Sequence, residues 1–99
     1  MTDEPDPTVE VRNNTAANRY EITVNGELAG FADYRVGERV VFSHTVVDPA
    51  FEGRGLASTL MGVALDETRL LDKTVVAQCT YVARFIGRHP QYQDMLLER

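Results

Sequence analysis

Apolar and polar residues alternate through much of the first half of the chain, which is the pattern of β-strands with one buried face. Asn25-Gly26 interrupts one long alternating segment, and this dipeptide tolerates the positive φ angles that a tight hairpin turn requires. A later segment rich in β-branched residues is typical of a largely buried strand. The predicted strands cover 8–14, the two arms within 19–36, and 39–47. Together they predict an antiparallel meander.

From residue 56 onward the apolar residues take up helical spacing. They recur at i, i+4, i+7 and i+8 from Leu56, which predicts a helix of about four turns over 56–71. His89-Pro90 ends a second helical segment. A short buried strand, that second helix and one or two closing helical turns are predicted at 72–79, 80–88 and 91–98. The element order β-β-β-β-α-β-α therefore indicates an α/β fold of α+β-like character.

The segments 39–47, 56–71 and 74–79 form a strand-helix-strand unit. If the two strands pair in parallel, the crossover is right-handed and both strands end at the same edge of the sheet. The loop that leaves the first strand and Cys79, which ends the second, then lie at that edge. We expect a ligand there, because α/β folds usually bind ligands at the carboxyl ends of their strands.

The loop itself, "FEGRGLAS" over 51–58, leaves two interpretations open. Glycines on a helix N-terminus let backbone N–H groups approach a phosphate, and Arg54 could add a positive charge. The alternative is a strand-to-helix turn that uses glycine only for its conformation. The loop is neither a P-loop, since no Gly-Lys-Ser/Thr follows, nor a dinucleotide fingerprint, since its third glycine is missing.

Composition and charge restrict the class of protein. The chain has 99 residues, of which 43% are hydrophobic and 25% charged, as in one small globular domain. Its net charge is -5, and three of its acidic residues lie in 1–8, which we expect to be a disordered tail before a domain over 9–99. No basic stripe is present, so we expect no nucleic-acid partner.

Targeting and redox signals favour the cytoplasm. No stretch approaches the ~18 apolar residues of a membrane span, and the acidic start is unlike a secretion signal. Cys79 is the single cysteine, so no internal disulfide can form. We expect a cytoplasmic protein that does not enter membranes, and either a monomer or a homodimer.

Two side chains are candidates for catalysis. Cys79 is either a small core residue or a nucleophile, and its place before a predicted helix favours thiolate character. His44 is either a structural histidine of a buried strand or a general base. On simple alternation His44 shares a face with Phe42 and Val46, while Ser43 and Thr45 point the other way.

The segment "VVDPAFEGRGLASTLMGVALDE" resembles the GNAT acetyltransferase superfamily. The family places a strand ending in Val-x-Pro before a Gln/Arg-x-x-Gly-x-Gly/Ala loop that opens a helix. The match is closer to a subfamily of very short GNAT-like proteins, and it covers about residues 20–96. Its further motifs are His44-Thr45, the segment Cys79-Thr80-Tyr81-Val82 and the segment Arg88-His89-Pro90-Gln91-Tyr92.

This resemblance implies that acetyl-CoA is the co-substrate. The pyrophosphate would lie on the loop amides, the pantetheine would run along the preceding strand, and the thioester would come close to Cys79. The implied cofactor-binding residues are Thr45, Val46, Val47, Gly53, Arg54, Gly55, Leu56, Ala57 and Ser58. Glu52 stands where the family has Gln or Arg. The helical pair and final strands of longer relatives are missing, and Phe85-Ile86 lie where a catalytic tyrosine is expected.

The resemblance therefore implies an N-acetyltransferase for an amine that the sequence does not identify, with no metal ion. Transfer could be direct, with His44 as the base, or could pass through an acetylated Cys79, which we favour. The alternative is a CoA-binding or interaction module without catalysis.

Overall fold

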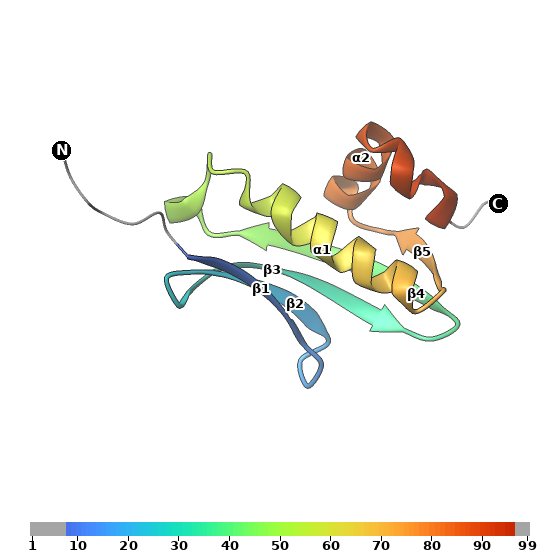
Figure 1. The fold of residues 1–99 in the computed structure, drawn as a ribbon, viewed down its shortest axis with the longest axis horizontal. Coiled ribbons are helices and arrows are strands. Elements are labelled where there is room, and N and C mark those ends of the chain that lie inside the picture. Colours follow the sequence, from blue (N-terminus) through green and yellow to red (C-terminus); the bar gives the residue numbers. More distant parts are fainter. Residues whose placement is uncertain (1–7, 97–99) are drawn as a thin grey trace.

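A computed structural model describes residues 8–96. Strands β1 to β4 form the antiparallel meander expected from the alternating segments, and β5 pairs with β4 in parallel. The sheet order β1-β2-β3-β4-β5 follows the sequence, which confirms the predicted fold class (Figure 1). The elements are β1 (Val9–Asn14), β2 (Arg19–Val24), β3 (Glu27–Val36), β4 (Arg39–Val47), α1 (Leu56–Leu70), β5 (Thr74–Ala77) and α2 (Thr80–Arg88), with 3₁₀ helices η1 (Pro49–Phe51) and η2 (Pro90–Met95). Of the tail predicted at 1–8, only Thr8 lies within the described residues.

Both α-helices pack on one face of the sheet, and no helix within residues 8–96 covers the other face (Figure 1). Side chains of all but the first strand join the two helices in one hydrophobic core. None of the helices formed by residues 8–96 is long and apolar enough to cross a membrane. The molecule thus has a helical face and an open face.

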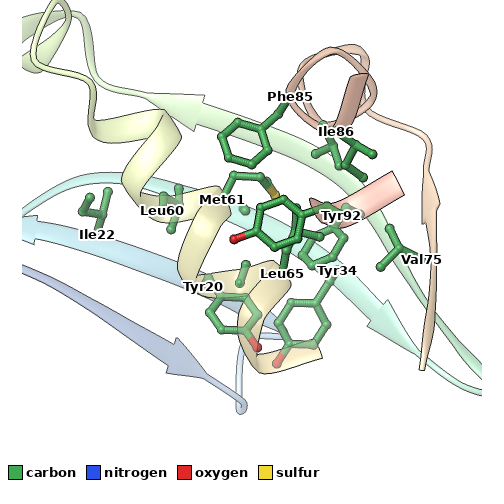
Figure 2. Packing of buried hydrophobic residues seen from close by; sticks show 14 of the residues in the cluster. Tyr20, Ile22, Tyr34, Leu60, Met61, Leu65, Val75, Phe85, Ile86 and Tyr92 are labelled. Atoms are coloured by element: carbon green, nitrogen blue, oxygen red, sulfur yellow. The ribbon is translucent and has the colours of Figure 1, made fainter. Parts of the chain in front are cut away.

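The core lies between α1, α2 and the middle strands. The helix α1 buries one stripe of side chains, while Val63, which the spacing also placed there, is only half-buried. Figure 2 shows Phe85, Ile86 and Tyr92 facing the side of α1 that carries Met61. Each fully buried large aliphatic or aromatic side chain stabilises the fold by ~1.5–3 kcal/mol. The buried stripe consists of Leu56, Leu60, Met61, Ala64, Leu65 and Thr68.

A glycine allows the close approach of β3 to the end of β4. A Cβ atom at Gly30 would lie 2.6 Å from the carbonyl oxygen of Val46 and 3.2 Å from the Cα of Val47. Such contacts require backbone movement, so any larger residue would push the end of β4 away. Gly30 therefore fixes the strand that borders the predicted ligand edge.

A β-bulge in β4 overturns one prediction. Tyr34 pairs with Phe42 and Asp33 pairs with His44, so Ser43 is an extra residue in β4. Because the bulge breaks the two-residue period, His44 lies on the open face, opposite to Phe42, and is exposed. Thr45 instead points to the helical face. The faces predicted for these two side chains by simple alternation were therefore wrong.

The C-terminal segment forms the predicted closing helical turns as a 3₁₀ helix rather than an α-helix. This helix is η2, after which Leu96 bridges in parallel to Val75, while 97–99 lie outside the described residues. The hydroxyl of Tyr92 donates to the Asp66 carboxylate of α1 at 2.8 Å, and the Arg69 guanidinium pairs with Asp94 at 3.0 Å. These contacts give the Arg-His-Pro-x-Tyr segment a structural role, because they hold η2 against α1.

Candidate active site

The strands β4 and β5 separate at the predicted ligand edge. Their last pair is Phe42 with Ala77, and the N–H groups of Gln78 and Cys79 both donate to the Phe42 carbonyl at 3.1 Å. Beyond this point β4 continues to Val47, which at ~3.3 Å per residue is about 16 Å of strand. The two strands do run toward the same edge, but β4 extends far beyond β5.

The continuation of β4 presents main-chain groups toward the side that β5 has left. The N–H of Asp48 donates to the carbonyl of Ala29 at 2.8 Å, so Asp48 and Val46 direct their main-chain groups to β3. Because these groups alternate along a strand, those of Thr45 and Val47 point away from β3. An extended ligand could pair with them as an added strand would.

Cys79 occupies the N-cap position of α2, half-buried at the border of the core. Burial acts to raise the pKa of its thiol, but nearby donors outweigh burial and hold the pKa below its usual range. These donors are, in decreasing order, the N–H of Val82, the hydroxyl of Thr45 and the N–H groups of Tyr81 and Thr45. The amides of Tyr81 and Val82 belong to the first helical turn, where they lack helical partners.

The hydroxyl of Thr45 lies beside this thiol without an ordinary hydrogen bond. Its Oγ1 is the one buried side-chain nitrogen or oxygen atom in the described part of the chain that lacks a hydrogen-bond partner. Its contact with the sulfur therefore falls short of an ordinary hydrogen bond. A buried polar atom without a partner costs ~1–3 kcal/mol, so a ligand that bonded Thr45 would recover part of this cost.

The loop before α1 has the backbone expected of an anion site. Gly53 and Gly55 have φ angles of +85° and +72°, and a Cβ at either would meet nothing within 4 Å. Gly55 is the N-cap of α1 and supplies no side-chain hydrogen bond, so the first amides of the helix face a pocket of about 250 Å³. This start of the helix depends on the positive φ of Gly55, an angle that residues other than glycine seldom adopt.

The charged side chains of the loop are exposed. The Arg54 guanidinium lies over the Phe51 ring, with 5.4 Å between its carbon and the ring centroid. Glu52 is also exposed, and it forms no salt bridge with a cationic side chain among residues 8–96. The pocket is bordered by the end of β4 as well as by the loop, with lining residues Val47, Phe51, Glu52, Gly53, Gly55, Leu56, Ala57 and Ser58.

Tyr81 connects the two helices near their N-termini, which the sequence did not indicate. Its hydroxyl lies 3.3 Å from the Ser58 hydroxyl, and its ring is 6.1 Å from that of Phe85. The contact joins the loop side of the site to the thiol side. Only its place in the Cys-x-Tyr-Val segment singled this residue out.

The predicted site residues thus fall into two groups, with His44 and Val46 outside both, because Val46 directs its main-chain groups to β3. Val47 lines the same pocket as the loop over 53–58, and Thr45 lies beside the thiol of Cys79. His44 lies on the open face, where Asp33 is its cross-strand neighbour. Among residues 8–96 no three His, Cys, Asp or Glu side chains gather in a way that could hold a metal ion.

Comparison with protein families agrees with this geometry. Residues 19–95 match the family model of GCN5-related N-acetyl-transferases. The chain belongs to the GCN5-related N-acetyltransferase (GNAT) family. The matched region includes the whole site, from β2 to η2.

Individual relatives are consistent with the family model. "Protein NATD1" of Bos taurus is 30% identical over 93 residues, which cover 89% of this chain and 82% of the relative. "Protein NATD1" of Xenopus tropicalis is 28% identical over 98 residues, covering 94% and 90%. A Staphylococcus aureus protein whose solution structure is described as GCN5-like superposes with a TM-score of 0.70 at 19% identity, covering 91% and 89% of the two chains. This GNAT protein therefore has the GNAT fold.

Proposed function

We propose that this protein binds acetyl-CoA and transfers its acetyl group to an amine by way of Cys79. The proposal rests on one observation: two different helix N-termini, those of α1 and α2, lie along the same unpaired stretch of β4. One N-terminus is bare and enters through Gly55, and the other directs its amides to a thiol. Family membership supports the choice of acetyl-CoA as the ligand.

In this proposal the loop binds the pyrophosphate. The free amides at the start of α1 donate to its oxygens, and the helix dipole adds partial positive charge. Arg54 contributes a full positive charge at the rim, while the carboxylate of Glu52 offers the pyrophosphate no cationic help. The pantetheine then pairs with the main-chain groups of Thr45 and Val47 and carries the thioester toward Cys79.

The chemistry begins with the Cys79 thiolate. It attacks the thioester carbonyl, so that a sulfur–carbon bond to Cys79 forms and the bond to the CoA sulfur breaks. CoA departs as a thiolate, and in this proposal the hydroxyl of Thr45 donates to the transient oxyanion. This route does not depend on an acidic tyrosine, since the leaving thiolate is stable enough to depart unprotonated near neutral pH.

The second half of the reaction regenerates the thiol. A neutral amine attacks the acetyl carbonyl, a nitrogen–carbon bond forms, and the bond to Cys79 breaks. The amine loses one proton in this step. His44, the predicted base for direct transfer, lies on the open face, opposite to Thr45, so in this route the proton passes to solvent.

Intact-mass measurement after mixing with acetyl-CoA tests the proposal. We expect the wild type to gain the mass of one acetyl group and Cys79→Ala to gain none, with amine acetylation falling at least about 100-fold. The His44→Ala variant is the matched control, and it should still become acetylated. An unmodified wild type together with undiminished turnover in Cys79→Ala would establish direct transfer instead.

Thermal unfolding separates catalysis from binding. At 100 times the dissociation constant, CoA should stabilise the wild type and Cys79→Ala alike by ~2.7 kcal/mol, which raises Tm by about 11–22 °C. A shift of this size without an acetyl adduct, and without turnover on a panel of amines, would identify a binding module. No shift in either protein would contradict CoA binding altogether.

A further inference from the structure

The strand β1 forms the margin of the sheet farthest from the proposed CoA site (Figure 1). It pairs with β2 on one side, and no other strand within residues 8–96 pairs with its outer side. Unpaired edges attract further strands, and proteins usually protect them with proline, charged side chains (lysine above all) or a bulge. The six residues of β1, Val9–Asn14, contain neither proline nor lysine, and their pairing with β2 is regular.

The register identifies the free main-chain groups. The Asn25 N–H donates to the Thr8 carbonyl at 2.8 Å, so Thr8 directs its main-chain groups toward β2. By alternation Glu10 and Arg12 do the same, while Val9, Val11 and Asn13 present both N–H and C=O outward.

The sequence of β1 is complementary to itself in the antiparallel direction. If two copies pair about Val11, each Val11 faces the same residue of the second copy, and both exchange N–H and C=O groups. Glu10 of either copy then lies opposite Arg12 of the other, so two pairs of opposite charges form across the strands. Val9 lies opposite Asn13, and these outward groups also exchange hydrogen bonds.

The surroundings of β1 suit this arrangement. The side chain of Arg12 is 76% exposed, and its 4.0 Å contact with Glu21 leaves room for a second carboxylate. Val9 is 42% exposed, and Val11 already packs at the border of the core. A two-fold axis through Val11 would run perpendicular to the sheet, so both helical layers would lie on the same side.

We propose that this protein forms a homodimer by antiparallel pairing of β1 with β1 of a second copy, which joins the two sheets into one. The proposal does not depend on acetyl transfer, because the candidate active site, where β4 and β5 separate, lies at the opposite margin of each sheet. Both candidate active sites stay accessible.

Charge reversal gives a sharp test by sedimentation of the full chain. The wild type, of 11.1 kDa, should sediment as a dimer of twice that mass. Glu10→Arg places only positive charges across the two-fold axis, and Arg12→Glu places only negative ones. Each variant alone should raise the dimer dissociation constant at least about tenfold. An equimolar mixture of the two should recover the dimer, because each positive position then faces a negative one.

Two further variants distinguish pairing from loss of fold. Val11→Pro removes an N–H that points away from β2, so the chain should keep its circular dichroism while the dimer is lost. Glu38→Arg, in the exposed turn after β3, makes the same charge change away from β1 and should leave the dimer intact.

Amide exchange supplies the direct readout. The amides of Val9, Val11 and Asn13 should exchange slowly at high protein concentration and faster on dilution. A wild type that is monomeric at about 1 mM would overturn the proposal. So would rapid exchange at these three amides in a dimer, or a mixture of the two charge variants that stays monomeric.

Discussion

The helices α1 and α2 both begin where a strand of the parallel pair has ended, yet their N-termini are built differently. The first begins with Gly55 in a left-handed conformation, which offers no side chain to the first amides. The second begins with Cys79, and the N–H groups of Val82 and Tyr81 lower the pKa of its thiol. The same backbone feature can thus serve an external anion in one place and an internal thiolate in another.

Replacing Gly55 should have the largest effect on this comparison. An alanine at a φ of +72° costs ~1–2 kcal/mol, although its Cβ would meet open space. We expect Tm to fall by about 4–8 °C per kcal/mol, and the affinity for CoA to fall about tenfold as the amides change direction. Differential scanning calorimetry and titration calorimetry measure the two effects.

The control for this variant is Gly87→Ala in α2. A Cβ at Gly87 also meets nothing within 4 Å, but its φ lies outside the left-handed region. This substitution should stabilise the helix by ~0.5–1 kcal/mol and leave CoA affinity unchanged. Equal losses of affinity in both variants would show that positive φ at Gly55 is not what directs the amides.

Thr45→Val should make the Cys79 thiol, at the N-terminus of α2, behave more like an ordinary thiol. Without the hydroxyl, one of the donors that lower the pKa of the Cys79 thiol is lost, so that pKa rises and less thiolate exists at pH 7. Alkylation by iodoacetamide at pH 7 should slow by a factor of up to about ten, the value of one weak hydrogen bond to a charged group.

The pH profile of alkylation shows the sign of this effect. In the wild type its midpoint should lie below that of an ordinary thiol, and in Thr45→Val it should move upward. Thr23→Val, which loses a hydroxyl from β2, is the control and should keep the wild-type midpoint. A midpoint unchanged by Thr45→Val would remove this hydroxyl from the thiol environment.

Arg54→Gln should produce the smallest effect. The side chain is exposed, so its attraction for a pyrophosphate is weakened by solvent and is worth ~0.2–1 kcal/mol. CoA affinity should fall at most about fivefold at low salt and less at 0.5 M salt, as measured by titration calorimetry. Arg84→Gln on α2 is the control. A loss far above fivefold would show that the charge of Arg54, rather than the amides of the loop, contributes most to CoA binding.

Most of the fold follows from local patterns in the sequence. Asn25-Gly26 specifies a hairpin because both positions adopt the positive φ that its turn needs. The change from alternating to helical spacing at Leu56 marks the start of α1, and the right-handed crossover then places the loop and Cys79 toward one edge. Each of these inferences depends on neighbours in the sequence or on a general rule of chain handedness.

What could not be predicted depends on pairing between distant strands. The bulge at Ser43 has no local signal, because it shows only in the register with Asp33 and Tyr34. As a result the sequence suggested His44, rather than Thr45, as the side chain on the core side of β4. The contact of Tyr81 with Ser58 likewise depends on how the two helices pack.

The bulge also lies at the point where β4 and β5 separate. Ser43 is inserted immediately after the last residue of β4 that pairs with β5, and a bulge bends its strand and increases the local twist. Loss of this single codon would leave the loop and Cys79 unchanged in sequence, but β4 would regain a regular ladder and could pair with the residues after Ala77. Under the proposed function, one deletion would therefore close the gap that acetyl-CoA enters, a requirement set by the number of residues in β4 and not by their identity.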